Sequence, residues 1–89
     1  MVTQEKQWWV YIVLTKKGRF YTGISTDVER RFLEHKHKKG AKFFRTDDAQ
    51  KIVYRERCEN RSVASIREAE IKTLRHEQKR KMIESATPC

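Results

Sequence analysis

The segment that decides the fold is residues 20–35, which read FYTGISTDVERRFLEH. It opens with aromatic and β-branched residues, a composition typical of strands, and it follows a similar run, WWVYIVL at 8–14, across a turn at Gly18. The two runs therefore predict an antiparallel hairpin. Gly23 interrupts the second run, where it indicates a structural turn, a bulge, or a place where another backbone or a ligand approaches closely.

The second half of the segment predicts a helix that begins at about Asp27. Thr26 lies three residues before Glu29, which is the spacing of a capping box. The apolar residues at helical spacing are Val28, Phe32 and Leu33. Arg31 and His35 are four residues apart, so they share a helix face at the edge of this apolar stripe. Packing alone gives neither side chain a reason to be there.

The rest of the chain predicts a third strand at 51–58 (KIVYRERC) and a helix for which Asn60 and Ser62 offer N-cap oxygens. The apolar face of that helix is marked by Val63, Ala64, Ile71 and Leu74. Residues 75–84 extend this helix or form a separate one. This order predicts an α+β fold, a small three-stranded antiparallel sheet flanked by helices (β-β-α-β-α-α). Because 89 residues is the size of one domain, we expect a single domain over residues 1–89, with its core at about 8–84.

Charge indicates the kind of partner. Lys and Arg number 21 against 12 Asp and Glu, which gives a net charge of +9. Such a field attracts phosphate backbones, so we expect a nucleic acid, DNA or RNA, as the partner. Cys58 and Cys89 have no neighbouring histidine at ligand spacing, which argues against zinc and fits a reducing cytoplasm. No apolar run reaches the length of a membrane span, so we predict a cytoplasmic protein with no membrane partner.

Two triplets carry a family resemblance. VYI at Val10–Ile12 and YTG at Tyr21–Gly23, followed by Arg31 and His35, resemble the motif of the GIY-YIG nucleases. The resemblance continues in GAK at 40–42, in NRSVA at 60–64, and in Glu68, Ile71 and Lys72. The ordered set is similar to small stand-alone bacterial GIY-YIG proteins whose cellular role is unassigned, and it implies the GIY-YIG endonuclease fold.

The resemblance also implies an activity, the metal-dependent hydrolysis of a phosphodiester bond in DNA, with a single Mg²⁺ or Mn²⁺ ion. Tyr21 would deprotonate or position the attacking water, and Tyr11 would support it through a hydrogen bond or through the scissile phosphate. Arg31 would stabilise a tyrosine anion and grip phosphate oxygens with its planar fork. His35 would act as a hydrogen-bond donor or proton carrier. Glu68 would bind the metal.

Further residues are candidates for nucleic-acid contacts. Lys42, Arg45 and Lys72 would contact the phosphate backbone, and Phe43 or Phe44 would stack on an exposed base. Helical geometry places both Glu68 and Glu70 at the edges of an apolar face, and only the resemblance selects Glu68. Two other functions stay open, a catalytically idle nucleic-acid-binding module and an adaptor that docks on an acidic protein. The sequence leaves the oligomeric state open, and one metal site in an isolated domain predicts nicking.

Overall fold

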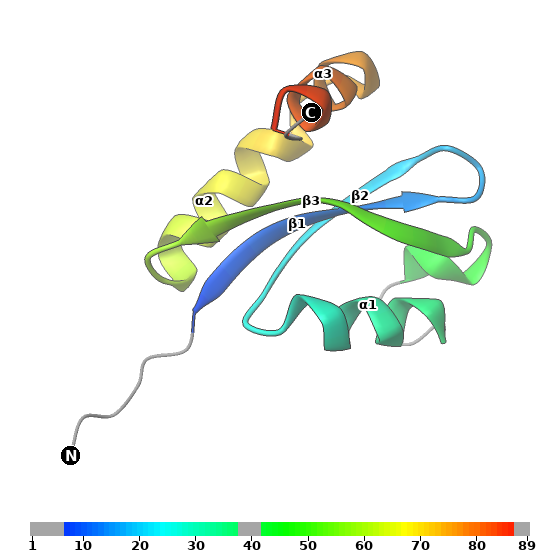
Figure 1. The fold of residues 1–89 in the computed structure, drawn as a ribbon, viewed down its shortest axis with the longest axis horizontal. Coiled ribbons are helices and arrows are strands. Elements are labelled where there is room, and N and C mark those ends of the chain that lie inside the picture. Colours follow the sequence, from blue (N-terminus) through cyan, green and yellow to red (C-terminus); the bar gives the residue numbers. More distant parts are fainter. Residues whose placement is uncertain (1–6, 38–41, 87–89) are drawn as a thin grey trace.

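The computed structural model describes residues 7–37 and 42–86. Along the chain the elements are β1 (Trp8–Thr15), β2 (Phe20–Ser25), α1 (Val28–Lys36), the 3-10 helix η1 (Lys42–Arg45), β3 (Ala49–Cys58), α2 (Arg61–Lys72) and α3 (His76–Ala86). The strands form one antiparallel sheet in the order β2-β1-β3, with β1 in the centre (Figure 1). The predicted α+β fold and its order of strands and α-helices are confirmed.

Helices cover both faces of the sheet, with α1 on one side and α2 and α3 on the other (Figure 1). Successive residues of a strand point to opposite faces, so β1 contributes alternate side chains to two separate clusters. The buried residues on the α2 face are Val10, Ile12, Cys58, Ala64 and Ile71. Those on the α1 face are Tyr11, Val13, Val28, Phe44 and Ala49. Burial on both faces explains why β1 is an unbroken apolar run.

The β1–β2 hairpin places Tyr11 directly opposite Gly23. Pairing between the two strands is continuous over six consecutive residue pairs, and Gly23 lies inside β2. The expectation of a structural turn or bulge at Gly23 is therefore wrong. The turn is at Gly18, whose φ of 83° lies in the left-handed region that favours glycine.

The N-terminal caps of α1 and α2 are set by single side chains. The Asp27 carboxylate accepts a hydrogen bond of 3.1 Å from the backbone N–H of Arg30. The predicted capping box of Thr26 and Glu29 is wrong, because α1 begins at Val28 and Asp27 occupies the cap position. Asn60 caps α2 as predicted.

The apolar stripes of the two helices are narrower than the sequence pattern indicated. Leu33 is 54 % exposed and Val63 is 41 % exposed, although both were expected on buried faces. A three-stranded sheet offers each helix little width. The residues buried in the two helices are Val28 and His35 of α1 and Ala64 and Ile71 of α2.

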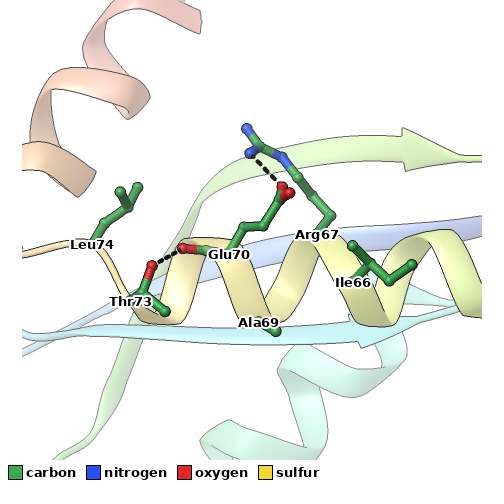
Figure 2. A pocket seen from close by; sticks show the side chains of 6 residues that line it. All are labelled: Ile66, Arg67, Ala69, Glu70, Thr73 and Leu74. Carbon is green, nitrogen blue, oxygen red and sulfur yellow. Dashed lines mark hydrogen bonds and ion pairs between the residues drawn. The ribbon is translucent and has the colours of Figure 1, made fainter.

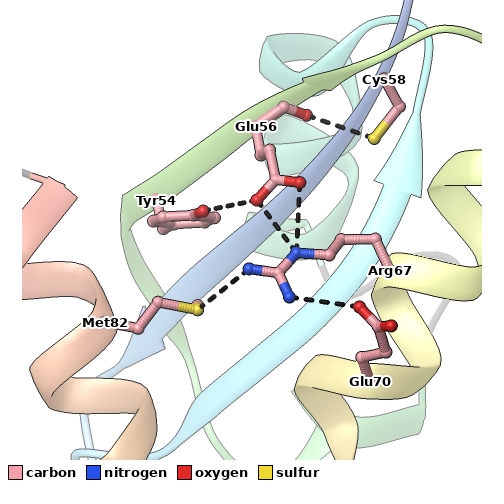
Figure 3. A network of polar contacts seen from close by, with 6 residues as sticks. All are labelled: Tyr54, Glu56, Cys58, Arg67, Glu70 and Met82. Atoms are coloured by element: carbon pink, nitrogen blue, oxygen red, sulfur yellow. Dashed lines mark hydrogen bonds and ion pairs between the residues drawn. The ribbon is translucent and has the colours of Figure 1, made fainter.

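A polar network fixes α2 on the sheet (Figure 3). Arg67 Nε of α2 donates to both carboxylate oxygens of Glu56 on β3, each at 3.1 Å, and Tyr54 donates to the same carboxylate at 2.6 Å. Arg67 also bonds Glu70 on its own helix and the sulfur of Met82 on α3. Because Arg67 directly precedes Glu68, this network sets the place of the predicted metal ligand.

The last predicted segment is a separate helix, α3, and does not extend α2. The backbone N–H of Arg75 donates to the Gln78 side chain at 2.9 Å, which closes the start of α3. His76 stacks on Phe20 with ring centroids 4.6 Å apart and hydrogen-bonds the Gly18 carbonyl. Helix α3 is thereby attached to the hairpin. Across residues 7–37 and 42–86, no helix is long and apolar enough to span a bilayer.

Candidate functional site

Three of the predicted site residues meet on the α1 face of the sheet. Tyr11 of β1 and His35 of α1 share a hydrogen bond of 2.9 Å between the phenolic oxygen and Nε2. The ring of Tyr21 on β2 lies edge-on to His35, with centroids 5.0 Å apart, and 6.5 Å from the ring of Tyr11. Residues 24 positions apart in the sequence are thus bonded in the buried interior.

Gly23 makes room for the Tyr11 ring. A Cβ atom added at Gly23 would lie 2.7 Å from the Tyr11 hydroxyl oxygen and 2.8 Å from the adjacent ring carbon. The ring therefore lies across the neighbouring strand, which carries the hydroxyl toward the β2 edge of the sheet. Of the roles that the sequence left open for Gly23, close approach is the one observed, and the approaching group is a side chain.

His35 is fully buried, whereas the sequence placed it at the edge of the apolar stripe of its helix. Its ring stacks on Phe44 at 4.4 Å, and its Nδ1 atom has no hydrogen-bond partner among the described residues. Burial, together with a smaller contribution from the Arg31 charge and against an opposing effect of Glu34, lowers the pKa of His35 to about 4. His35 is therefore a neutral imidazole near pH 7.

Tyr11 is also held in its neutral form. Burial raises the pKa of its phenol, and the charges of Tyr21 and Glu68 act in the same direction. Arg31 opposes this rise through its charge and a hydrogen bond to the Tyr11 hydroxyl, without reversing it. Tyr11 is therefore a neutral phenol within the cluster and a poor base.

Arg31 lies at the entrance to this cluster with its side chain one-third exposed. Its Nη1 atom donates to Glu34 at 2.6 Å, and this hydrogen bond raises the pKa of the guanidinium. Glu34 was absent from the predicted set, although its position three residues after Arg31 is the spacing of a helical ion pair. The Arg31 guanidinium is thus bonded to Glu34 through Nη1 and also interacts with the Tyr11 hydroxyl.

Glu68 approaches from the other layer of the fold. It lies on α2, yet its charge contributes to the raised pKa of Tyr11. Its carboxylate pairs with Lys72 at 3.3 Å, and its side chain is 24 % exposed. Glu70, the alternative left open by helical periodicity, is bonded to Arg67 instead.

The described residues contain no cluster of three or more His, Cys, Asp or Glu side chains able to hold a metal. Among these residues, the set of such side chains at Glu68 therefore has fewer than three members. That set fits Mg²⁺ or Mn²⁺ only as an ion that keeps most of its water and shares a phosphate oxygen, which is how Mg²⁺ commonly binds in phosphoryl-transfer sites.

The predicted nucleic-acid contacts are placed unequally. Lys42 and Arg45 are exposed on η1, and Lys72 is exposed on α2 but paired with Glu68. Phe44 is fully buried, so the expectation that it could stack on a base is wrong, whereas Phe43 is partly exposed. Lys38, Lys39, Gly40 and Ala41 lie outside the described residues, and with them most of the GAK element.

A second surface feature lies along α2 (Figure 2). This groove is lined by Ile66, Arg67, Ala69, Glu70, Thr73 and Leu74. Its two charged groups bond each other at 3.2 Å, and the Thr73 hydroxyl donates to the Glu70 carbonyl at 2.6 Å. The polar atoms of the groove are thus occupied, and none of the predicted site residues lines it.

Comparison with known proteins identifies close relatives. Residues 7–81 match the family described as the GIY-YIG catalytic domain. A UPF0213 protein of Desulfotalea psychrophila is 42 % identical over 85 residues, covering 94 % of this chain and 77 % of its own length. A UPF0213 protein of Staphylococcus haemolyticus is 46 % identical over 76 residues, covering 85 % and 93 %. The solution NMR structure of EF2693 from E. faecalis superposes with a TM-score of 0.60 at 32 % identity, covering 94 % and 90 %.

Proposed function

Because the chain belongs to the GIY-YIG family, and within it to the small bacterial UPF0213 proteins of unknown function, we propose that it binds DNA and hydrolyses a phosphodiester bond with a divalent metal. GIY-YIG nucleases typically use such a metal. The observation that carries the proposal is the convergence of Tyr11, Tyr21 and His35, with Arg31 at their edge. Structural needs alone do not account for two phenols, an imidazole and a guanidinium in one place.

Tyr21 is the residue that we assign to the attacking water. It is only partly buried, and no hydrogen bond of its hydroxyl to another described residue is observed, so the hydroxyl is available to a water molecule. Tyr11 by contrast is 1 % exposed and already bonded to His35. Tyr11 and His35 would hold the Tyr21 ring in place and keep bulk water out of the cluster.

Arg31 is assigned to the phosphate. A guanidinium binds nonbridging phosphate oxygens through two parallel N–H groups, and Glu34 occupies only part of the Arg31 fork. Its positive charge beside Tyr11, at the edge of the cluster, would also favour a transient negative charge on the attacking water.

Glu68 would hold the metal, with water and the substrate phosphate as the other ligands. A bound divalent ion stabilises the charge that develops on the leaving oxygen. The ammonium group of Lys72 now lies against this carboxylate. We therefore expect Lys72 to turn toward the DNA backbone when a metal occupies Glu68, which would leave Lys42, Arg45 and Lys72 as backbone contacts.

One observation favours a second function. The single carboxylate at Glu68, neutralised by Lys72, is a weak metal site before substrate binds. A chain that binds DNA or RNA without cutting it, alone or with a protein partner, would have the same fold and charge. We take residues 1–89 to act as one domain in either case, because both buried clusters share the same sheet. The two scattered cysteines fit a reducing cytoplasm as its location.

Cleavage of labelled DNA tests the proposal. Single-stranded, duplex and branched substrates are incubated with Mg²⁺ or Mn²⁺ and wild type, Glu68→Ala or Glu70→Ala, while binding is followed in parallel. We expect metal-dependent nicking that Glu68→Ala abolishes without loss of binding, and that Glu70→Ala retains. If the wild type binds DNA without cutting it, or if Glu68→Ala cuts as well as wild type, the proposed nuclease function is wrong and the chain is better described as a nucleic-acid-binding module.

A further inference from the structure

We propose that Arg19, held on the face of Phe43 by the buried carboxylate of Asp47, is a phosphate-binding residue for the DNA strand beside the candidate site. None of the three residues belongs to the triplets or to the helix positions that carry the family resemblance. The inference rests on the DNA binding of the proposed function and does not require cleavage.

The anchor of this arrangement is Asp47, which lies between η1 and β3. Its side chain is 0 % exposed, although a buried carboxylate is costly unless its oxygens are fully hydrogen-bonded. Oδ1 accepts from the backbone N–H of Lys17 at 3.1 Å, Oδ2 accepts from Arg19 Nε at 2.8 Å, and the Thr15 hydroxyl donates as well. Burial would raise the pKa of Asp47, but these donors outweigh it and hold the pKa below its usual range.

Arg19 is fixed at three points. Its backbone N–H donates to the Thr15 hydroxyl oxygen at 3.0 Å, its Nε donates to Asp47, and its guanidinium carbon lies 4.4 Å from the centre of the Phe43 ring. The side chain is nonetheless 48 % exposed. Its Nη1 and Nη2 atoms have no hydrogen-bond partner among the described residues, so the outer edge of the fork is open.

An arginine in this state suits a phosphate better than a mobile surface residue does. The planar fork presents parallel donors that match two phosphate oxygens. Much of the rotamer entropy that a long side chain loses on binding has already been lost in the folded protein, because Asp47 and Phe43 fix its orientation. The carboxylate lies behind the guanidinium, where it is shielded from solvent, and it cannot compete at the open edge.

The position of Arg19 links it to the candidate site. Phe43 contacts Tyr21 with ring centroids 5.3 Å apart, so Arg19 is separated from the tyrosine cluster by a single aromatic ring. Lys42 and Arg45 flank Phe43 on η1 and are exposed. A strand whose scissile phosphate faces Tyr21 and Arg31 would therefore pass Arg19 within a few nucleotides, and Phe43 would form part of the floor beneath it.

The competing explanation is structural, since the Arg19–Asp47 pair also joins the hairpin turn to the loop before β3. Salt dependence separates the two explanations, because each phosphate contact contributes about 0.9 to the log-log slope of affinity against salt on duplex DNA. The affinity of the full chain for a labelled duplex is measured without divalent metal, from low to moderate salt. Arg57→Gln is the matched control, because Arg57 is an exposed arginine at the opposite end of the sheet, paired with Trp9, and its loss removes the same charge.

We expect Arg19→Gln to reduce the slope by about 0.9 and to weaken binding on the order of tenfold at 0.1 M salt. Arg57→Gln should leave the slope nearly unchanged. Arg19→Gln leaves a buried carboxylate without its partner, so the Arg19→Gln/Asp47→Asn double variant is measured as well. The double variant should show the same loss of slope as Arg19→Gln and a higher melting temperature than Arg19→Gln. Equal slopes for the Arg19 variants, Arg57→Gln and wild type would overturn the proposal.

The outcomes also distinguish this proposal from the proposed function. If the chain binds DNA through Arg19 but never cuts it, the phosphate-binding role of Arg19 stands and the nuclease function is rejected. If the chain cuts DNA but its salt slope does not depend on Arg19, the nuclease function stands and the role of Arg19 is rejected. Absence of any salt-dependent DNA binding would overturn both.

Discussion

Replacing Gly23 with alanine should destabilise the protein, because the added methyl group would overlap the buried ring of Tyr11. The added Cβ would lie 2.7 Å from the Tyr11 hydroxyl oxygen, 2.8 Å from Cζ and 3.2 Å from Cε1. Tyr11 is 1 % exposed and bonded to His35, so its ring cannot swing into solvent to relieve the contact. Overpacking of this kind costs about 1–3 kcal/mol. For a domain of this size each kcal/mol lowers the melting temperature by about 4–8 °C.

Thermal unfolding followed by circular dichroism measures this loss, and Gly18→Ala serves as the control glycine. A Cβ at Gly18 meets no atom within 4 Å, so its cost comes only from the backbone φ of 83°. An L-residue in the left-handed region costs about 1–2 kcal/mol. The melting temperature alone therefore does not separate the two causes, and a double-mutant cycle is needed.

The cycle combines each glycine variant with Tyr11→Leu, which removes the ring. We expect the cost of Gly23→Ala to fall by at least about 1 kcal/mol in the Tyr11→Leu background, and the cost of Gly18→Ala to stay the same. Tyr11→Phe should give little relief, because Cζ remains 2.8 Å from the new methyl group. A Gly23→Ala protein that melts within a degree or two of wild type, or whose loss is unaffected by Tyr11→Leu, would refute this account of the glycine.

Two further predictions concern buried polar groups. Burial lowers the pKa of His35 from 6.5 to about 4, so between these pH values the unfolded chain binds a proton that the folded chain does not, and stability falls as pH falls. Urea unfolding at pH 7 and pH 4.5 should show a loss of about 2 kcal/mol that is smaller in His35→Gln, and an equal loss in both proteins would contradict it. Thr22 is 3 % exposed and its hydroxyl has no partner among the described residues, so Thr22→Val should raise the free energy of unfolding by about 1 kcal/mol. A lower melting temperature for Thr22→Val would show that the hydroxyl is satisfied in solution.

The strands and helices were predictable because their signals are local. The apolar run of β1, the turn at Gly18 and the Asn60 cap each specify structure within a few residues of themselves. The errors at the start of α1 have the same origin. Thr26 and Asp27 are both good caps one residue apart, and local sequence does not decide between them. The exposure of Leu33 depends on the width of the sheet, which the helix sequence does not encode.

The chemical environment of the site residues was not predictable from spacing. The position of His35 on α1 indicated a functional face, but its complete burial depends on Tyr11 and Phe44, which lie in other elements. Asp47 gave no signal at all, because an aspartate in a polar loop is ordinarily exposed and its burial follows from donors on the hairpin. Spacing likewise did not show that Arg67 is bonded to β3 and holds Glu70, or that Glu68 pairs with Lys72.

The two halves of the candidate site differ in how far they are assembled before substrate arrives. The aromatic half is buried, neutral and bonded internally, since Tyr11 and His35 share a hydrogen bond without any ion. The acidic half is a single, partly exposed carboxylate on the helix that covers the opposite face, and its charge is balanced by Lys72. Under the proposed function, a metal must displace that ammonium group and gain further ligands from the phosphate. Metal and DNA should therefore bind cooperatively, because each supplies what the other lacks at Glu68.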